Sequence, residues 1–289
     1  MTLRIEIISL FLAILLIATN FVGILNPADY RKNPKIVEFS KDKIEVKRRY
    51  MNNLVKSENP DNLINYNNAL SYMDKAFQKY GKSFKFIEYS TKIWHNSVVY
   101  SDNPKDLKRV KFSQNWVFFL FNKIEFLKKK MSLDNHYNQF SNLQTNNYKQ
   151  ALRRAFGICS QSALAYSDML QKRYKIKSQI AGMQGHVVTV VKINNNEFIT
   201  DPSTGISFNF SFIDFNKNKS LLKKINKEYD RLNFNHNKAY DKWVDKKIVL
   251  KTTHSFNPNP YERISEYLNW LVPFILLIFS IVRIKNRKS

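Results

Sequence analysis

The fold is decided by residues 151–205, which read ALRRAFGICSQSALAYSDMLQKRYKIKSQIAGMQGHVVTVVKINNNEFITDPSTG. This stretch holds the only cysteine of the chain, Cys159. After it, apolar residues recur at steps of three and four, at Ala163, Tyr166, Leu170 and Tyr174. Such spacing is typical of one face of a helix. We therefore expect a helix that begins at Cys159.

A thiol in the first turn of a helix faces the positive end of the helix dipole and unsatisfied backbone N–H groups. Both favour the thiolate, the form that attacks carbonyl carbons. The alternative is that Cys159 is a buried structural cysteine, which is the commoner role of a lone cysteine. The residues that follow along the chain bear on this choice.

His186 lies in GHVVTVV, residues 185–191, a run of β-branched residues that predicts a strand. Gly185 beside it permits close approach of another backbone or of a substrate. A second strand is predicted over Glu197–Thr200, and it ends at Asp201-Pro202. Each polar residue also has an ordinary interpretation, as a satisfied strand histidine and as a turn-initiating aspartate.

A specific register would bring the two together. If Val191 pairs with Asn196 around a four-residue turn, Lys192–Asn195, then His186 lies directly opposite Asp201 on one sheet face. Asp201 could then hold the imidazole while His186 holds the thiolate of the nucleophile.

At these residues the chain resembles the transglutaminase-like cysteine superfamily. GICSQSA is similar to its nucleophile motif, GHVVTV to its His strand and DPSTG to its Asp turn. The match covers roughly residues 115–210. The resemblance implies an α+β fold with a papain/transglutaminase-like core, in which a Cys-bearing helix packs on an antiparallel sheet. It also implies Cys159 as nucleophile, His186 as base and Asp201 as orienter, with no cofactor and no metal.

The oxyanion donor is left open beyond the backbone N–H of Cys159. NWVFFLFNKIEF, residues 115–126, is similar to the Trp-bearing helix that often precedes the Cys in this superfamily, which places Trp116 there. Trp116, Gln144 and Gln150 are the candidates for oxyanion binding or positioning. A single Cys excludes an intramolecular disulfide framework and a thiolate metal cluster within the chain.

Two apolar segments flank this region. Ile7–Leu25 predicts an N-terminal transmembrane anchor over residues 1–25, with a cleaved signal peptide as the alternative. Tyr267–Val282 predicts a C-terminal transmembrane helix over residues 264–284, with a buried amphipathic helix as the alternative. We expect the bilayer to be a partner of both.

The tail, residues 285–289, follows Arg283 and is basic, which places the C-terminus in the cytoplasm. Two spans return the N-terminus to the same side. The catalytic domain is then predicted outside the cytoplasmic membrane, on the periplasmic or extracellular face, with a peptide or protein substrate and other cell-envelope proteins as partners.

The predicted order between the spans is a lead-in region, 26–110, and a transglutaminase-like domain, 111–255. Within them we expect a linker over 26–49, loops over 132–147, helices over 62–80 and 115–127, and one or two strands over 84–100.

Charge does not point to nucleic acid. The chain has 47 Lys+Arg against 23 Asp+Glu, a formal net charge of +24, but the basic residues are scattered and form no recognition motif. The sequence therefore predicts a membrane-anchored cysteine enzyme that forms a thioester on peptide or amide carbonyls, with hydrolysis favoured over amine transfer. The alternative is a catalytically silent, membrane-tethered binding or assembly module for the cell envelope or for polysaccharide export.

Overall fold

The computed structural model describes residues 2–25, 64–100, 115–130, 145–183, 186–211, 214, 221, 249–251 and 260–286. They divide into two compact units, one of residues 1–28, 103–143 and 258–289, the other of residues 29–102 and 144–257. The fold is mixed, with helices, a small antiparallel sheet and two apolar helices near the chain ends. The predicted linker, most of the predicted loop, Gln144, Gly185 and the last three residues lie outside the described residues.

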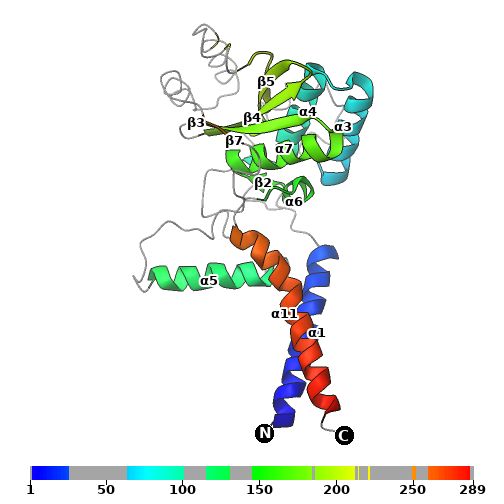
Figure 1. The fold of residues 1–289 in the computed structure, drawn as a ribbon, viewed down its shortest axis with the longest axis vertical. Coiled ribbons are helices and arrows are strands. Elements are labelled where there is room, and N and C mark those ends of the chain that lie inside the picture. Colours follow the sequence, from blue (N-terminus) through cyan, green and yellow to red (C-terminus); the bar gives the residue numbers. More distant parts are fainter. Residues whose placement is uncertain are drawn as a thin grey trace. The chain divides into compact units, whose positions relative to one another are not determined.

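The described part of the second unit contains the sheet and the helices that cover it (Figure 1). Its helices are α3 (Tyr66–Tyr80), α4 (Phe84–Ser97), α6 (Tyr148–Arg154) and α7 (Cys159–Tyr174). Its strands are β1 (Val99–Tyr100), β2 (Phe156–Gly157), β3 (Lys177–Met183), β4 (His186–Ile193), β5 (Asn196–Asp201), β6 (Ile206–Phe208) and β7 (Val249–Lys251).

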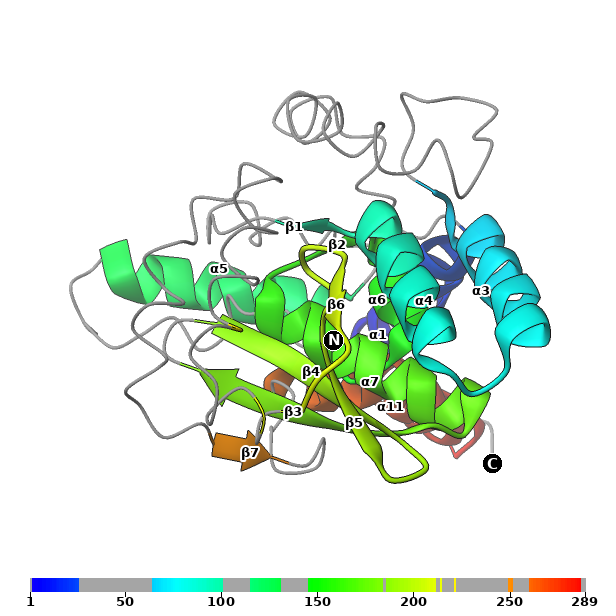
Figure 2. The same cartoon turned by 90° about the horizontal axis from the view of Figure 1, so that it is seen from above.

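The main sheet has the strand order β6-β5-β4-β3-β7, and every neighbouring pair is antiparallel (Figure 2). Helix α7 packs on β3 and β4, and α4 packs on β5 and β6. The helix that begins at Cys159 ends at Tyr174, and the C-cap residue Lys175 is left-handed at φ 54°. The chain then turns back into β3, so α7 packs on the strand that directly follows it in the sequence.

The register of β4 and β5 differs from the predicted one by two residues. Ile193 pairs with Asn196, so the hairpin turn has two residues, and Asn194 takes the left-handed φ of 56° that asparagine tolerates. Asp201 therefore comes level with Val188 rather than with His186. Side chains alternate with a period of two, so this even shift keeps His186 and Asp201 on one face, now diagonal to each other.

Residues 84–97 form a helix, so the prediction of strands there is wrong. The buried residues of this segment, 86–87, 90–95 and 97, do not alternate with the period of two that is typical of a half-buried strand. A cap at Ser83 also favours the helix, because its hydroxyl accepts from the backbone N–H of Phe86. The backbone becomes extended at Val98, and the last two residues of the segment form β1.

One hydrophobic core joins the four helices to β4 and β5. Its largest side chains include Trp94 on α4 and Tyr166 on α7, whose rings meet edge to face at 5.6 Å. Residues 160–170 of α7 are all buried, so the Cys-bearing helix is the central element of this unit (Figure 2). A helix buried on every side holds its first residue in a fixed place.

The first unit consists of α1 (Thr2–Leu25), α5 (Trp116–Lys130) and α11 (Pro260–Lys285). Within α1 and α11, Ile5–Leu25 and Ile264–Lys285 are long and apolar enough to cross a membrane, at 21 and 22 residues. At about 1.5 Å per residue each is roughly as long as the hydrocarbon layer is thick.

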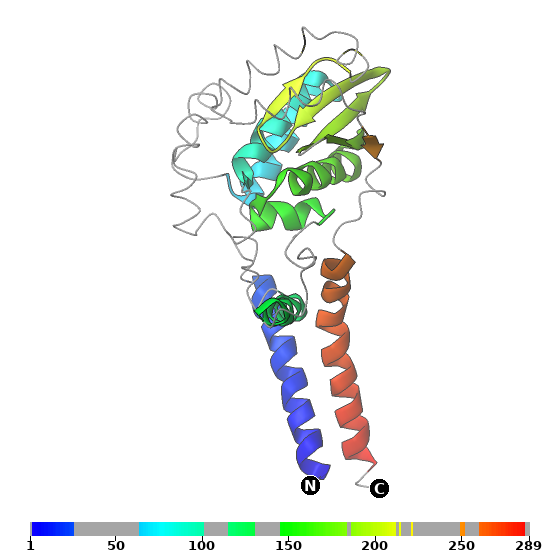
Figure 3. The ribbon, with the colours of Figure 1, turned by 90° about the vertical axis from the view of Figure 1, so that its left-hand side faces the viewer.

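Polar side chains join α1 to α11, which lie side by side (Figure 3). The Ser9 and Ser280 hydroxyls are 2.6 Å apart, and the Asn20 amide donates to the Asn269 carbonyl at 2.6 Å. The contacts are eleven residues apart on both helices, 9 to 20 and 269 to 280. Eleven residues make about three turns, so each helix presents both groups on one face.

Candidate active site

Cys159 is the first residue of α7, as the periodicity predicts, and its side chain is half-buried. The residue before it, Ile158, is the N-cap and offers no side-chain cap to the helix. The first N–H groups of α7 therefore receive no hydrogen bond from the side chain of the N-cap residue. The thiol thus combines partial access to solvent with a position at the positive end of a 16-residue helix.

The side chain of Gln161, in the first turn of α7, ties the start of the helix to the backbone of Thr145. Its buried amide accepts from the Thr145 backbone N–H at 2.7 Å and donates to the Thr145 carbonyl at 2.8 Å. Gly157 makes room for this side chain, because a Cβ there would lie 2.6 Å from Gln161 Cγ. The glycine before the nucleophile therefore has a packing role.

His186 and Asp201 form a buried pair. Nε2 of His186 and Oδ2 of Asp201 are 2.7 Å apart, and the side chains are 3% and 1% exposed. A carboxylate can only accept, so Nε2 carries the proton and donates it. Because Nε2 is bonded to Asp201, Nδ1 is the nitrogen through which His186 would exchange a proton with Cys159.

The second oxygen of Asp201 is held by the turn that follows it. Oδ1 accepts from the Ser203 backbone N–H at 2.9 Å and from the Ser203 hydroxyl at 2.5 Å. The carboxylate is therefore bonded at both oxygens while it is completely buried. Such bonds favour the ionised carboxylate and fix its plane.

The site favours the charged imidazolium. Burial of the ring by itself lowers the pKa of His186, but the charge and hydrogen bond of Asp201, together with those of Cys159, outweigh burial and raise the pKa to about 10. The three predicted residues are thus electrostatically connected, with Cys159 acting on the ring as well as Asp201. A proton on the imidazole favours a thiolate beside it.

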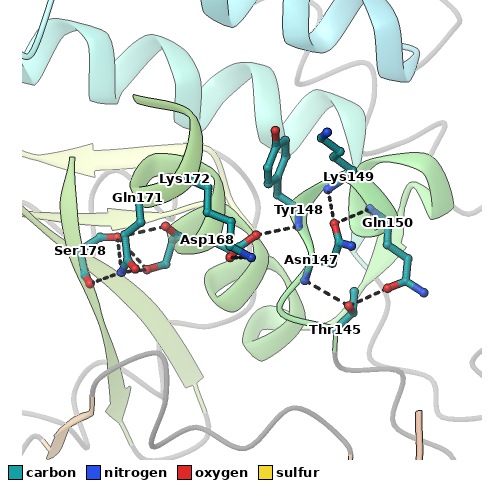
Figure 4. A network of polar contacts seen from close by, with 10 residues as sticks. Thr145, Asn147, Tyr148, Lys149, Gln150, Asp168, Gln171, Lys172 and Ser178 are labelled. Atoms are coloured by element: carbon teal, nitrogen blue, oxygen red, sulfur yellow. Dashed lines mark hydrogen bonds and ion pairs between the residues drawn. The ribbon is translucent and has the colours of Figure 1, made fainter. Parts of the chain in front are cut away.

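The structure gives the oxyanion candidates the following positions. Gln150 is on α6, where its side-chain oxygen accepts from the Thr145 hydroxyl at 2.7 Å (Figure 4). Trp116 begins α5 in the first unit, in an apolar cluster with Val117 and Leu16. Gln144 is outside the described residues. The structure adds Gln161, Thr145 and Ser203 to the site, and Gln150 joins it through the Thr145 hydroxyl.

Sequence reasoning gave these three no role. For Ser203 a local signal exists, because an Asp side chain commonly bonds the backbone two residues on. Gln161 and Thr145 meet across 16 positions of sequence, so no local pattern reports their contact.

No group of three or more His, Cys, Asp or Glu that could hold a metal ion occurs among the described residues. The chain matches no protein-family model, no curated protein and no solved structure.

Proposed function

We propose that the chain is a membrane-anchored, transglutaminase-like cysteine enzyme that cleaves or transfers acyl groups from amide carbonyls. One observation carries the proposal: the buried Asp201–His186 pair, whose imidazole interacts with a half-buried thiol at a helix start. The order Cys on α7, His on β4 and Asp on β5 supports the papain/transglutaminase-like description of the core.

In the first step the Cys159 thiolate adds to the carbonyl carbon of a carboxamide. The oxygen takes the negative charge and is stabilised by the backbone N–H groups at the start of α7. The C–N bond then breaks, and the imidazolium of His186 gives its proton to the leaving amine. The products are a free amine or ammonia and a thioester on Cys159.

In the second step His186 is neutral and acts as the base. It takes a proton from water, whose oxygen attacks the thioester carbonyl, and Cys159 leaves as the thiolate. The product is a carboxylic acid. An amine in place of water would give a new amide, and hydrolysis is favoured only because water is always present.

The proposed location is the outer face of the cytoplasmic membrane. Two candidate spans bring both chain ends to one side, and Arg283 and Lys285 in the last turn of α11 favour the cytoplasm for that side. The sheet-containing unit then faces peptides and proteins of the cell envelope, which are the substrates we propose.

The test uses the full chain in detergent or membranes. A peptide chloromethyl ketone, in which the ketone replaces the scissile amide, should alkylate wild-type Cys159 and should label neither Cys159→Ser nor His186→Ala appreciably. Incubation with cell-envelope peptides should add an acyl mass to Cys159 that hydroxylamine removes, as expected of a thioester.

Circular dichroism of both variants must first show the wild-type fold. A folded wild-type protein that reacts with the probe no faster than Cys in a denatured chain would contradict the enzyme and would favour the binding or assembly module.

A further inference from the structure

Helix α4 contacts the Asp201 segment on both sides. Thr91 and His95 lie one turn apart on this helix and are both buried. The Thr91 hydroxyl is 2.6 Å from the Thr200 hydroxyl, and His95 Nδ1 is 2.7 Å from the Ser203 carbonyl oxygen. Thr200 directly precedes Asp201, and Ser203 follows it by two residues.

The His95 contact has a defined direction. A carbonyl oxygen only accepts, so Nδ1 of His95 carries a proton and donates it. Ser203 in turn donates its N–H and O–H to Asp201 Oδ1, while Asp201 Oδ2 accepts from His186. A continuous series of hydrogen bonds thus runs from α4 through the turn to the imidazole of His186.

The His95 ring also packs tightly beneath this turn. Gly205 has φ 79°, and a Cβ there would lie 3.0 to 3.1 Å from three atoms of His95. The backbone N–H of Gly205 donates to the Asp201 carbonyl at 2.9 Å, which closes the turn. A residue with a side chain at position 205 would have to displace the ring that holds Ser203.

The Thr91 contact belongs to a network that reaches the nucleophile helix. Tyr166 lies seven residues after Cys159 on α7, and its hydroxyl is 2.9 Å from the Thr91 hydroxyl and 2.7 Å from that of Ser90. Burial raises the pKa of Tyr166, so the phenol stays neutral and can donate. The Thr200 hydroxyl continues the network to Ser207 on β6 at 2.8 Å.

We infer that Thr91 and His95 are positioning residues. They hold the Asp201 carboxylate in the position and orientation that keep the His186 imidazole directed toward Cys159. This inference rests on the proposed function, because it assigns α4 a role in that same site. Neither residue touches the reacting atoms; both act through the segment that carries the orienter. A merely structural role would be to stabilise the core without affecting the thiolate.

The experiment measures the alkylation rate of the full chain by iodoacetamide at pH 5.5 and pH 8.5. Since Cys159 is the only cysteine, the added mass reports this thiol alone. The quantity compared is the rate at pH 5.5 divided by the rate at pH 8.5. A thiolate–imidazolium pair keeps this ratio near one, whereas the alkylation rate of an ordinary thiol falls about tenfold for each pH unit below its pKa. The variants are Thr91→Val, which keeps the shape without the hydroxyl, His95→Leu, and His95→Asn, which retains a donor.

Ser97→Ala is the matched control. Ser97 is fully buried on the same helix, and its hydroxyl donates to the Ile93 carbonyl at 2.7 Å. We expect His95→Leu and Thr91→Val to lower the ratio of the rate at pH 5.5 to the rate at pH 8.5 at least about tenfold. His95→Asn should recover most of the ratio, and Ser97→Ala should keep the wild-type value even if its melting temperature falls.

Two results would overturn the inference, and they differ. If the wild-type ratio is near one and His95→Leu and Thr91→Val keep it while they melt earlier, α4 is only structural and the proposed enzyme stands. If the wild-type ratio itself is that of an ordinary thiol, the proposed activation of Cys159 fails, and the positioning role fails with it.

Discussion

Asp201 is the residue on which the candidate site depends most. Its two carboxylate oxygens accept three hydrogen bonds, two from Ser203 and one from His186, in a completely buried position. A buried carboxylate so placed can orient an imidazole and stabilise its positive charge together. The pair is therefore more than a strand histidine beside a turn aspartate.

The variant Asp201→Asn tests whether both carboxylate oxygens are needed, one for Ser203 and one for His186. The sequence alone predicts a mild effect, because an amide oxygen still accepts the imidazole N–H. In the structure both carboxylate oxygens of Asp201 accept hydrogen bonds, but an asparagine amide has one oxygen. Its NH2 group would therefore face a donor, either Ser203 or the imidazole N–H of His186. We expect probe labelling of Cys159 to fall by orders of magnitude, toward the roughly 10⁴-fold known for the wrong tautomer in serine-protease triads. Labelling within about threefold of wild type would contradict the orienter role.

The raised pKa of His186 predicts how stability depends on pH. Its value of about 10 in the folded protein exceeds the ordinary 6.5. The imidazolium therefore contributes stability that is fully present below about pH 6.5 and is lost as the pH rises through about 10. Thermal unfolding followed by circular dichroism should show a lower melting temperature at pH 10 than at pH 6.

His186→Gln removes the titrating group and is the control for the Lys and Tyr residues that also titrate there. The fall in melting temperature between pH 6 and pH 10 should be smaller in this variant. An identical fall would mean that His186 is not held as the imidazolium.

At the scale of elements, the start of α7 depends on close packing between Gly157 and Gln161. A Cβ on residue 157 would meet Gln161 Cγ at 2.6 Å and Cβ at 3.0 Å, neither of them at the free end of the side chain. Because the Gln161 amide is bonded to the Thr145 backbone, the clash cannot be relieved without moving the helix start.

Gly157→Ala should therefore displace Cys159 and cost about 1–3 kcal/mol, as overpacking does. We expect probe labelling to fall about tenfold or more, since small misplacements of reacting groups are costly. Gly81→Ala is the matched control, because Gly81 has φ 57° at the end of α3 and a Cβ added there would meet no atom within 4 Å. It should lose stability through backbone strain of order 1–3 kcal/mol and keep the labelling rate.

At the scale of the molecule, the pairing of α1 with α11 has a defined register. Ser9→Cys with Ser280→Cys, in a Cys159→Ser background, should form a disulfide under a mild oxidant, because the native hydroxyls are 2.6 Å apart. The pair Ser9→Cys with Ile278→Cys is the control, since Ile278 is 61% exposed. Counting free thiols with a maleimide gives the readout, and equal cross-linking of both pairs would contradict the register.

Membrane topology is a separate prediction. Two spans with a basic C-terminal tail predict that both ends are cytoplasmic and the segment between them is outside. Reporter fusions at Ser289 and near Asn138 should therefore give opposite compartments. Identical compartments would contradict the two-span topology, and a mature N-terminus beyond Leu25 would show cleavage of the first segment.

Local patterns in the sequence were sufficient to locate α7, β4 and β5. The helix begins at Cys159 because apolar spacing begins there, and His186 and Asp201 fall at strand ends because β-branched runs begin and end beside them. The shared sheet face was also predictable. Side chains alternate with a period of two, so that an error of two residues in the register left it unchanged.

Three features were decided only by tertiary structure. Residues 84–97 have a strand-like composition, yet they form α4, because packing against α3, β5 and β6 outweighs the weak local preference. The turn at Asn194 has two residues because the strands pair in the register that their packing selects. The support of Asp201 by Thr91 and His95 spans more than 100 positions of sequence. Contacts of that range appear only when the chain is folded, because nothing in the neighbouring residues encodes them.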